Sequence, residues 1–370
     1  MKSRIEKLAV AIEAHQLDAC LITSAAALRY FSDYYFYFEY GASPFQVLPA
    51  VLLVDKSLQG TLLLADNETP PATAAAKNLS VRPYSSYVYE TPLDFNRDFL
   101  NQLKSLFGEM NFRASRIGIE KNSLPFVITE LLIYLHPSIE FIDLSPDIDR
   151  LRIVKDDDEI EQIRAACRLC DIGQTAAMRY ARPGITELEL FTMMRAEMDV
   201  AVGLRVPLMA DLVSGSRSAT GGGMPTDKVI SAGDLILCDL TPCLNGYWGD
   251  SCNSFVVGEM SKEQSRTFAL VLEALETGIG AIRPGMKASA IDELMRKHIG
   301  NYPHHSGHGV GLDYHEEPRI VPYNHMELKK NMVIALEPAI YEKGYGIRLE
   351  HLVAVTEDGC EVLTKFRHAE

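Results

Sequence analysis

The chain has 370 residues, more than one ordinary hydrophobic core accommodates, so two domains are expected. Hydrophobic residues account for 47% of the chain and charged residues for 23%, which is the composition of a soluble globular protein. The net charge of −14 argues against nucleic acid and anionic membranes as partners, because both need clustered Lys and Arg on the protein.

The N-terminal segment, residues 1–23, is amphipathic, whereas a signal peptide would contain an unbroken apolar core. No later stretch is long and apolar enough to span a bilayer. Seven cysteines are scattered through apolar surroundings, and this odd, dispersed set indicates reduced thiols in a cytoplasmic protein. Cys167 and Cys170 form a CxxC pair in a helical pattern without a second pair, which favours core cysteines over a zinc or redox site.

The first 150 residues alternate helix-like and strand-like segments, which indicates an α/β domain. The spacing predicts helices over 5–16 and 104–110 and strands over 19–22, 47–54, 61–64 and 117–120. No glycine-rich phosphate loop occurs among these segments, so nothing supports nucleotide binding.

A domain boundary is expected near residues 147–155, which gives an N-terminal domain over 1–150 and a second domain over 151–370. Beyond the boundary, the acidic residues 156–159 open a long amphipathic helix. Negative charge at that place complements the positive end of the helix dipole.

The second domain contains a weak internal repeat. Arg-Pro-Gly occurs at 182–184 and again at 283–285, each time between two helical patterns. Coincidence is one explanation, since Pro-Gly turns are common. The matching patterns on both sides favour a duplicated half-domain over a solenoid, whose repeats are much shorter.

Two acidic residues lie on a predicted β-hairpin. An apolar strand pattern interrupted by Asp239 precedes Asn245-Gly246, a strong two-residue hairpin signal. A return strand over 247–257 then places Asp250 opposite Thr241, so that Asp239 and Asp250 are diagonal neighbours roughly 7–8 Å apart. Two buried carboxylates repel each other, and a divalent cation between them removes the repulsion.

Histidines are concentrated in one later segment. Four occur within twelve residues, and glycines around them permit close approach of the backbone. A lone histidine is more often a structural hydrogen-bonding partner, but this density indicates a site. The four are His304, His305, His308 and His315.

Two further acids occupy apolar runs near the C-terminus. Glu337 ends one run, and Glu350 precedes another strand-like run over 352–355. A turn at Lys343-Gly344 would bring the strands together, and alternation places Arg348 on the same face as Glu350.

The sequence therefore offers four carboxylates and one imidazole at buried-looking positions, a donor set that fits two ions such as Mn²⁺, Co²⁺, Fe²⁺ or Zn²⁺. Ligand type alone does not choose among these ions; Mn²⁺ and Co²⁺ are the first expectation, with Zn²⁺ and Fe²⁺ as alternatives. Two ions roughly 3.5–4 Å apart can hold a bridging hydroxide and polarise a carbonyl. The ligands expected are Asp239, Asp250, His308, Glu337 and Glu350.

The order and spacing of these ligands resemble the pita-bread metallopeptidase family, which includes methionine aminopeptidase, prolidase, aminopeptidase P and creatinase. The resemblance rests on GDLILCDL, NGYWGDS, GHGVGLDYHEEP, ALEPAIY and GIRLEHLVAVTEDG, within residues 233–359. The linker LRIVKDDDEIEQIR and the size of the N-terminal domain are similar to the prolidase, aminopeptidase P and creatinase branch. The fold implied is α+β, a pita-bread catalytic domain after an α/β creatinase/prolidase-type domain.

The resemblance implies roles for the site residues. Glu337 would be a metal ligand and proton shuttle, and His315 would stabilise the tetrahedral intermediate and contact substrate. His304 and Arg348 match substrate-binding residues of enzymes that act on prolyl substrates. Asp250 and Glu350 would bridge the two ions. The implied reaction is hydrolysis of Xaa-Pro amide bonds in a small peptide.

The chain departs from the family near the site. Gly222 stands where relatives carry a histidine before Pro-Thr/Ser-Asp, and Cys252-Asn253 replaces a Thr-Arg pair. Loss of a positioned acid–base group costs roughly 10²–10⁴ in rate. Two alternatives to an Xaa-Pro peptidase follow: hydrolysis of a small non-peptide amide, as in creatinase and ectoine hydrolase, and a peptide-binding scaffold.

The same branch implies a homodimer in which the N-terminal domain shapes the partner's cleft. The aromatic segment 34–40 is a candidate for that contact or for lining the substrate cleft, and burial in the core explains it equally well.

Overall fold

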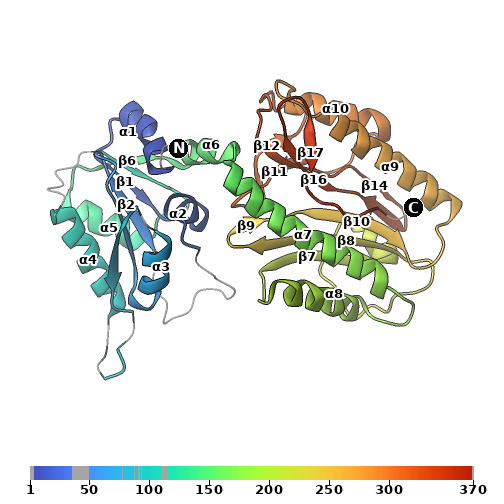
Figure 1. The fold of residues 1–370 in the computed structure, drawn as a ribbon, viewed down its shortest axis with the longest axis horizontal. Helices are drawn as coiled ribbons and strands as arrows, with labels where there is room; N and C mark the ends of the chain where they lie inside the picture. Colours follow the sequence, from blue (N-terminus) through green and yellow to red (C-terminus); the bar gives the residue numbers. More distant parts are fainter. Residues whose placement is uncertain are drawn as a thin grey trace. The chain divides into compact units, whose positions relative to one another are not determined.

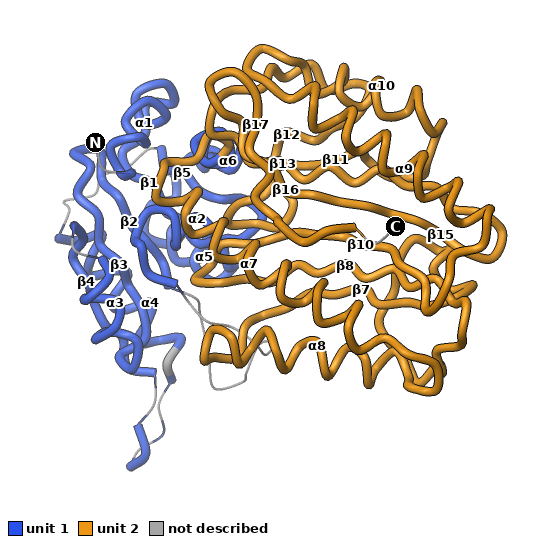
Figure 2. Tube along the Cα trace, turned by 45° about the vertical axis from the view of Figure 1, so that its right-hand side comes forward, with its two compact units in different colours: residues 1–152 blue, residues 153–370 orange. Residues whose placement is uncertain are grey.

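The computed structural model describes residues 4–35, 50–76, 78–86, 88–90, 92, 94–109 and 116–368. The chain divides into two compact units, residues 1–152 and 153–370 (Figure 2). Among the described residues, no helix combines the length and the hydropathy that crossing a membrane requires.

Unit 1 is built on a six-stranded mixed sheet with strand order β4-β3-β2-β1-β5-β6. Its central strands are buried on both faces because helices cover them, and α4 contributes Phe99 and Leu103 to one core. The strands are β1 Ala19–Ile22, β2 Val51–Asp55, β3 Gly60–Ala65, β4 Ser80–Tyr84, β5 Arg116–Ile119 and β6 Glu140–Asp143. The helices are η1 Arg4–Leu8, α1 Ala9–His15, α2 Ala25–Ser32, η2 Asp66–Glu68, α3 Thr69–Ala75, α4 Phe95–Glu109, α5 Phe126–Leu135 and α6 Ser145–Ile153.

These elements confirm the α/β pattern expected for the first part of the chain, including the strands near 19–22, 61–64 and 117–120. The helix expected over 104–110 begins earlier, at Phe95. Residues 36–40 of the aromatic segment and 47–49 of the second expected strand lie outside the described residues. Tyr34, at the start of that segment, is buried and donates its hydroxyl to Glu68.

Unit 2 contains two antiparallel sheets and a small hairpin, and Figure 1 shows α7 and α8 against one sheet and α9 and α10 against the other. The strands of the sheets are β7 Leu208–Ser214, β8 Leu235–Leu244, β9 Tyr247–Trp248, β10 Ser251–Val256, β11 Gly307–Gly309, β12 Glu316–Ile320, β13 Val333–Leu336, β16 His351–Val355 and β17 Cys360–Val362. The hairpin is β14 Ala339–Glu342 with β15 Tyr345–Arg348. The helices are α7 Asp157–Tyr180, α8 Glu187–Val202, η3 Gly215–Thr220, α9 Lys262–Ala281 and α10 Ala288–Ile299.

Helix α7 begins where the run of acidic residues predicts it. Asp156 and Glu159 form a capping box, in which each side chain accepts a hydrogen bond from the backbone of the other. Cys167 and Cys170 are buried and unpaired on this helix, and burial raises the pKa of both thiols. The expectation of core cysteines is confirmed.

The two Arg-Pro-Gly turns have the same hydrogen bonds, so the repeat is structural. Gly184 N donates to Ile230 O at 3.0 Å, and Gly285 N donates to Leu328 O at 2.9 Å. The residues just before α8 and α10, Thr186 and Lys287, each form one isolated β-bridge, to the segment before β8 in the first case and before β13 in the second. The expected duplicated half-domain is confirmed.

The hairpin at Asn245-Gly246 forms with the expected register, in which Leu244 pairs with Tyr247. The prediction of one continuous return strand over 247–257 is wrong, because the pairing stops after Trp248 and resumes at Ser251. The cause is Pro242, which pairs in register with this gap and has no N–H to complete the ladder. Asp250 therefore lies in the two-residue gap between β9 and β10.

Candidate metal centre

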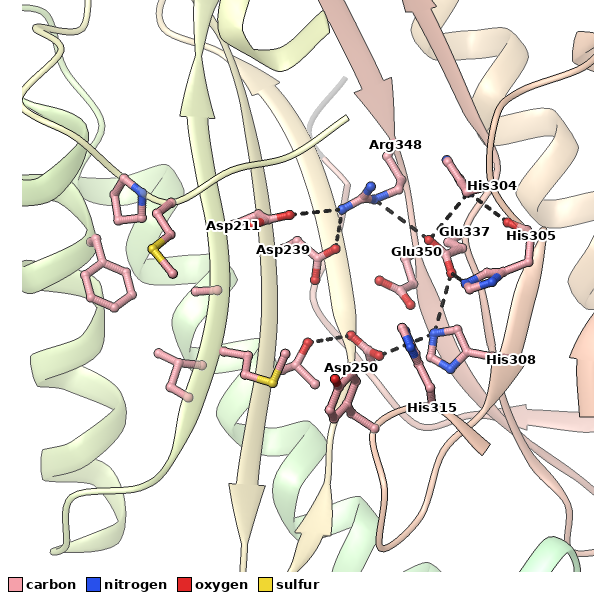
Figure 3. A pocket seen from close by; sticks show the side chains of 18 of the residues that line it. Asp211, Asp239, Asp250, His304, His305, His308, His315, Glu337, Arg348 and Glu350 are labelled. Atoms are coloured by element: carbon pink, nitrogen blue, oxygen red, sulfur yellow. Dashed lines mark hydrogen bonds and ion pairs between the residues drawn. The ribbon is translucent and has the colours of Figure 1, made fainter. Parts of the chain in front are cut away.

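The expected ligands come together at one cavity of about 710 Å³ in unit 2. Figure 3 shows carboxylates, histidines and one arginine converging there from strands of both halves. The expected site residues that line the cavity are Asp239, Asp250, His304, His308, His315, Glu337, Arg348 and Glu350.

The four carboxylates form two equivalent pairs. Asp239 follows Gly233 by the same interval as Glu337 follows Asn331, and both Gly233 and Asn331 have positive φ, 84° and 67°. Gly233 N donates to Val257 O at 2.8 Å, and Asn331 N donates to Val355 O at 2.9 Å. Asp250 and Glu350 lie directly before β10 and β16, the strands that return alongside β8 and β13. Duplication of the backbone therefore places the acids in matching positions.

His308 is oriented as a ligand. Its Nδ1 donates to Gly309 O at 3.0 Å, which leaves the Nε2 lone pair facing Asp250 Oδ2 at 3.6 Å and Glu337 Oε1 at 3.5 Å. Burial lowers the pKa of His308 to about 4, so the ring is neutral at pH 7. A neutral imidazole fixed through its other nitrogen is the usual form of a metal-bound histidine.

Asp250 and Glu350 are carboxylates that a cation would stabilise. Both are buried, and Thr241 Oγ1 donates to Asp250 Oδ1 at 3.0 Å. No described residue donates a hydrogen bond to the Glu350 carboxylate. Burial, and then repulsion among the neighbouring carboxylates, raises the pKa of both groups well above the usual range. Asp250, His308 and Glu350 can each direct one ligand atom to a common point, with these atoms within 4.8 Å of one another.

Asp239 and Glu337 are held by neighbouring cationic groups and hydrogen-bond donors. Burial raises the pKa of Asp239 to about 6, although Arg348 Nη2 donates to its carboxylate and opposes the shift. Burial acts in the same direction on Glu337, but the hydrogen bond from His305 Nε2 at 2.9 Å, the adjacent His308 imidazole and the positive charge of Arg348 outweigh it and lower the pKa. Hard oxygen donors with one imidazole suit divalent ions. That all five residues are ligands stays a prediction.

Arg348 and His304 belong to one hydrogen-bonded chain. Arg348 Nη1 donates to Gly221 O at 2.6 Å and to the Tyr341 hydroxyl at 3.3 Å. His304 Nδ1 donates to His305 O at 2.8 Å, so its Nε2 accepts from the Tyr341 hydroxyl at 2.9 Å. Protein groups therefore occupy both ring nitrogens of His304 and most donors of Arg348.

His315 lies beside the expected ligands, with its ring centroid 4.3 Å from that of His308. Burial lowers its pKa, and the neutral ring retains one N–H to donate into the cavity. Its contact with substrate, which the resemblance implies, stays a prediction.

Sequence reasoning gave no role to several polar residues of the site, among them Asp211, His305 and Tyr341. His305 was visible as one of four clustered histidines, and its role as the donor to Glu337 depends on the fold. Asp211 carried the same signal as Asp239, an acid inside an apolar strand pattern. The two residues lie opposite each other on β7 and β8. Tyr341 gave no signal, since it reaches the site across the β14–β15 hairpin.

A duplicated α+β domain with carboxylates and a histidine around one central cavity defines a pita-bread metallohydrolase. Comparison with known sequences gives the family. Residues 161–357 match Metallopeptidase family M24, and residues 4–154 match the Creatinase/Prolidase N-terminal domain. The chain belongs to this metallopeptidase family, and its N-terminal domain is of the creatinase/prolidase type.

Similar proteins share both domains. The chain is 32% identical over 374 residues to an Xaa-Pro dipeptidase of Pyrococcus furiosus, covering 99% of this chain and 98% of that protein. The prolidase of Pyrococcus horikoshii superimposes with a TM-score of 0.84 at 29% identity, covering 99% of each chain. An X-Pro aminopeptidase of Thermotoga maritima superimposes with a TM-score of 0.82 at 27% identity, covering 99% of this chain and 98% of that one. The α+β fold expected from the sequence is confirmed.

Proposed function

We propose that the chain hydrolyses the amide bond between a first residue and a following proline, as a dipeptidase or an aminopeptidase. The observation that carries the proposal is the full set of five acidic and imidazole donors around a cavity that His315 and Arg348 also line. Its similarity to an Xaa-Pro dipeptidase over nearly the whole chain supports the same reaction.

Two divalent ions are part of the proposal, Mn²⁺ or Co²⁺ first and Zn²⁺ or Fe²⁺ as alternatives. Bound ions of this kind polarise a carbonyl and lower the pKa of water. The residues that would hold them are Asp239, Asp250, His308, Glu337 and Glu350.

Protein groups supply the proton transfers and the contacts to the reacting amide. The lowered pKa of Glu337 keeps it a carboxylate at neutral pH, so it can accept a proton from water and return it to the leaving amine. The hydrogen bond from His305 Nε2 orients that carboxylate. Neutral His315 can donate its N–H to the amide oxygen as negative charge develops there, an interaction that strengthens toward the transition state.

The test is release of proline from Xaa-Pro dipeptides, and of prolyl peptides from longer substrates, with Mn²⁺ or Co²⁺ added to the purified chain. Comparison with Glu337→Ala separates turnover by this site from contamination. Equal rates for the two proteins would end the proposal.

A second function is favoured by one observation, the glycine at position 222. Asp211 occupies the space that a side chain at position 222 would need. The histidine that the family resemblance leads us to expect at this position is therefore replaced by glycine and cannot act in catalysis. The alternative is hydrolysis of a small non-peptide amide. A panel of small amides and cyclic amidines, assayed beside the prolyl peptides, distinguishes the two, because peptide-only turnover excludes the alternative.

The cellular setting is also a proposal. No disulfide links the cysteines among the described residues and six of the seven are buried, which supports a reducing compartment such as the cytoplasm. The homodimer implied by the resemblance is tested by light scattering of the purified chain at several concentrations, and a monomer throughout would contradict it.

A further inference from the structure

Asp211 is a fifth acidic residue in the cavity, outside the expected ligand set. It lies on β7 directly opposite Asp239 on β8, which places both carboxylates on one face of the sheet. Figure 3 shows Asp211, Asp239 and Arg348 converging at one end of the site, and the histidines at the other. Like charges opposite each other destabilise a sheet, and a cation at this place is favourable.

Arg348 satisfies Asp211 only in part. The guanidinium donates to Asp239 through Nη2, and its approach to Asp211 Oδ2, 4.0 Å, is too long for a hydrogen bond. No described residue donates a hydrogen bond to the Asp211 carboxylate, and 41% of the side chain is exposed. The carboxylate can therefore accept hydrogen bonds from a molecule that enters the cavity.

Gly222 gives Asp211 this position. A Cβ added at residue 222 would lie 2.0 Å from Asp211 Oδ2, so any larger residue there would displace the carboxylate. The φ of Gly222 lies outside the left-handed region, unlike that of Gly221 at 87° or Gly223 at 147°, so its backbone does not require glycine. Glycine at position 222 is thus explained by the space that Asp211 occupies.

The surroundings of Asp211 identify the chemistry of its ligand. The adjoining wall of the cavity is apolar, formed by residues of α8, of β7 and of the loop after η3: Leu188, Phe191, Leu208, Met209, Met224 and Pro225. A wall of this kind accommodates the methylene stem of a long cationic side chain, whose charged end then reaches the carboxylate.

Charge balance points the same way. Four carboxylates of the expected ligand set match two divalent ions, which leaves Arg348 as the one permanent cation among the described residues that line the cavity. A free carboxylate on the substrate that approached Arg348 would also meet Asp211. This end of the cavity therefore does not favour anions.

We propose that Asp211 is a specificity residue that selects substrates carrying an ammonium or guanidinium group on an aliphatic stem, and that Gly222 holds open the space for it. The proposal rests on the proposed amide hydrolysis at this site. It names a substrate class within that reaction.

The test compares peptides that differ in one charge. In one series lysine or norleucine precedes proline, as in Lys-Pro-Ala and Nle-Pro-Ala. In the other, lysine amide or norleucine amide follows Ala-Pro. With Mn²⁺ loaded, we expect kcat/KM to favour lysine over norleucine by roughly tenfold in one of the two series, the size of one hydrogen bond to a charged group.

Asp211→Asn should reduce that preference to about twofold or less, and Asp358→Asn should leave it unchanged. Asp358 is the matched control because it is an exposed residue of the same unit outside the cavity, and its substitution removes the same charge. Gly222→Ala should also reduce the preference, since it displaces the carboxylate without removing it.

Several outcomes would overturn the proposal. One is a lysine preference that persists in Asp211→Asn, and another is equal rates for lysine and norleucine in the unmodified chain. An equal loss on every peptide would show that Asp211 acts only through Arg348, and a loss of bound metal would make it a ligand. If no peptide is cleaved at all, the proposed function fails first, which is a distinguishable result.

Discussion

The two halves of unit 2 contribute to the cavity in different ways. The first half supplies Asp239 and Asp250, and the second supplies Glu337 and Glu350 from matching positions of the repeat. The histidines of the site come from the second half alone: His304, His305, His308 and His315. The first half contributes Asp211 to the cavity, next to Gly222.

The difference is clear at the positions that lie across from the inner carboxylates. Asp211 lies across from Asp239 and faces the cavity. Ser306, whose carbonyl accepts from Glu337 N, is fully buried and donates its hydroxyl to Asp292 instead. The backbone that the two halves share explains the two carboxylate pairs. The side chains that differ between the halves are the ones that we expect to serve acid–base chemistry in one half and substrate selection in the other.

The largest effect should come from the carboxylates that the repeat pairs with each other. Asp250→Asn and Glu350→Gln should each lower kcat/KM on the order of 10³-fold, because each removes a buried charge expected to hold a divalent ion. Metal content per chain, measured on the purified variants, should fall in both. Glu342→Gln, an exposed change on β14, serves as the control. Full metal content in either variant would contradict the symmetric ligand set.

Removing His315, a histidine without a counterpart in the first half, should lower the catalytic rate less than loss of a carboxylate does. It should leave the metal content unchanged. We expect His315→Ala to lower kcat by roughly 10²–10³-fold, the usual result of losing a donor to a developing oxyanion. Steady-state kinetics and metal analysis on one preparation separate the two quantities. A parallel loss of metal would assign His315 to the ligands, together with His305 and His308, with which its nitrogen can converge.

Metal removal should destabilise the chain in a pH-dependent way. Burial raises the folded-state pKa of Asp250 and Glu350 well above the usual range and that of Asp239 to about 6, so the folded chain binds more protons than the unfolded chain. Stability of the metal-free chain should therefore fall as pH rises from about 4 through 6 and beyond. Glu337 has a lowered pKa, and its opposite contribution grows until the unfolded carboxyl has ionised, so it is complete only above about pH 5.

Each ion at 100 times its dissociation constant should restore about 2.7 kcal/mol, which raises the melting temperature of a unit of this size by roughly 5–10 °C per ion. Calorimetry of the chelated and the Mn²⁺-loaded chain at pH 5 and pH 7.5 measures both effects. A metal-induced gain that is no larger at pH 7.5 than at pH 5 would show that carboxylate repulsion is not what the ions relieve.

Much of this site was accessible from the sequence because its signals are local. An acid inside an apolar strand pattern, a two-residue turn and a dense group of histidines each depend on a short segment. The hairpin register predicted from Asn245-Gly246 is confirmed at Leu244 and Tyr247, and only the break opposite Pro242 was missed. That break is also local, and the missing N–H of proline could have predicted it.

What the sequence could not provide are contacts between distant segments. The absence of an expected histidine at Gly222 was visible, but its physical reason was not, because Asp211 reaches that space from another strand. The same holds for Tyr341, which joins Arg348 to His304. Such contacts depend on how sheets and loops pack, and no periodicity along the chain encodes them.

The smallest effect, and the most direct test of this distant contact, is a double-mutant cycle between positions 211 and 222. Gly222→Ala alone should cost about 1 kcal/mol of unfolding free energy, since its Cβ would overlap the Asp211 carboxylate. In an Asp211→Ala background the same change should be nearly neutral, because the overlapping atoms are gone. Urea denaturation of the four metal-loaded proteins should then give a coupling of roughly 0.5–1 kcal/mol. Additive effects would mean that Gly222 is not explained by Asp211, and the two departures of the first half would then need separate physical explanations.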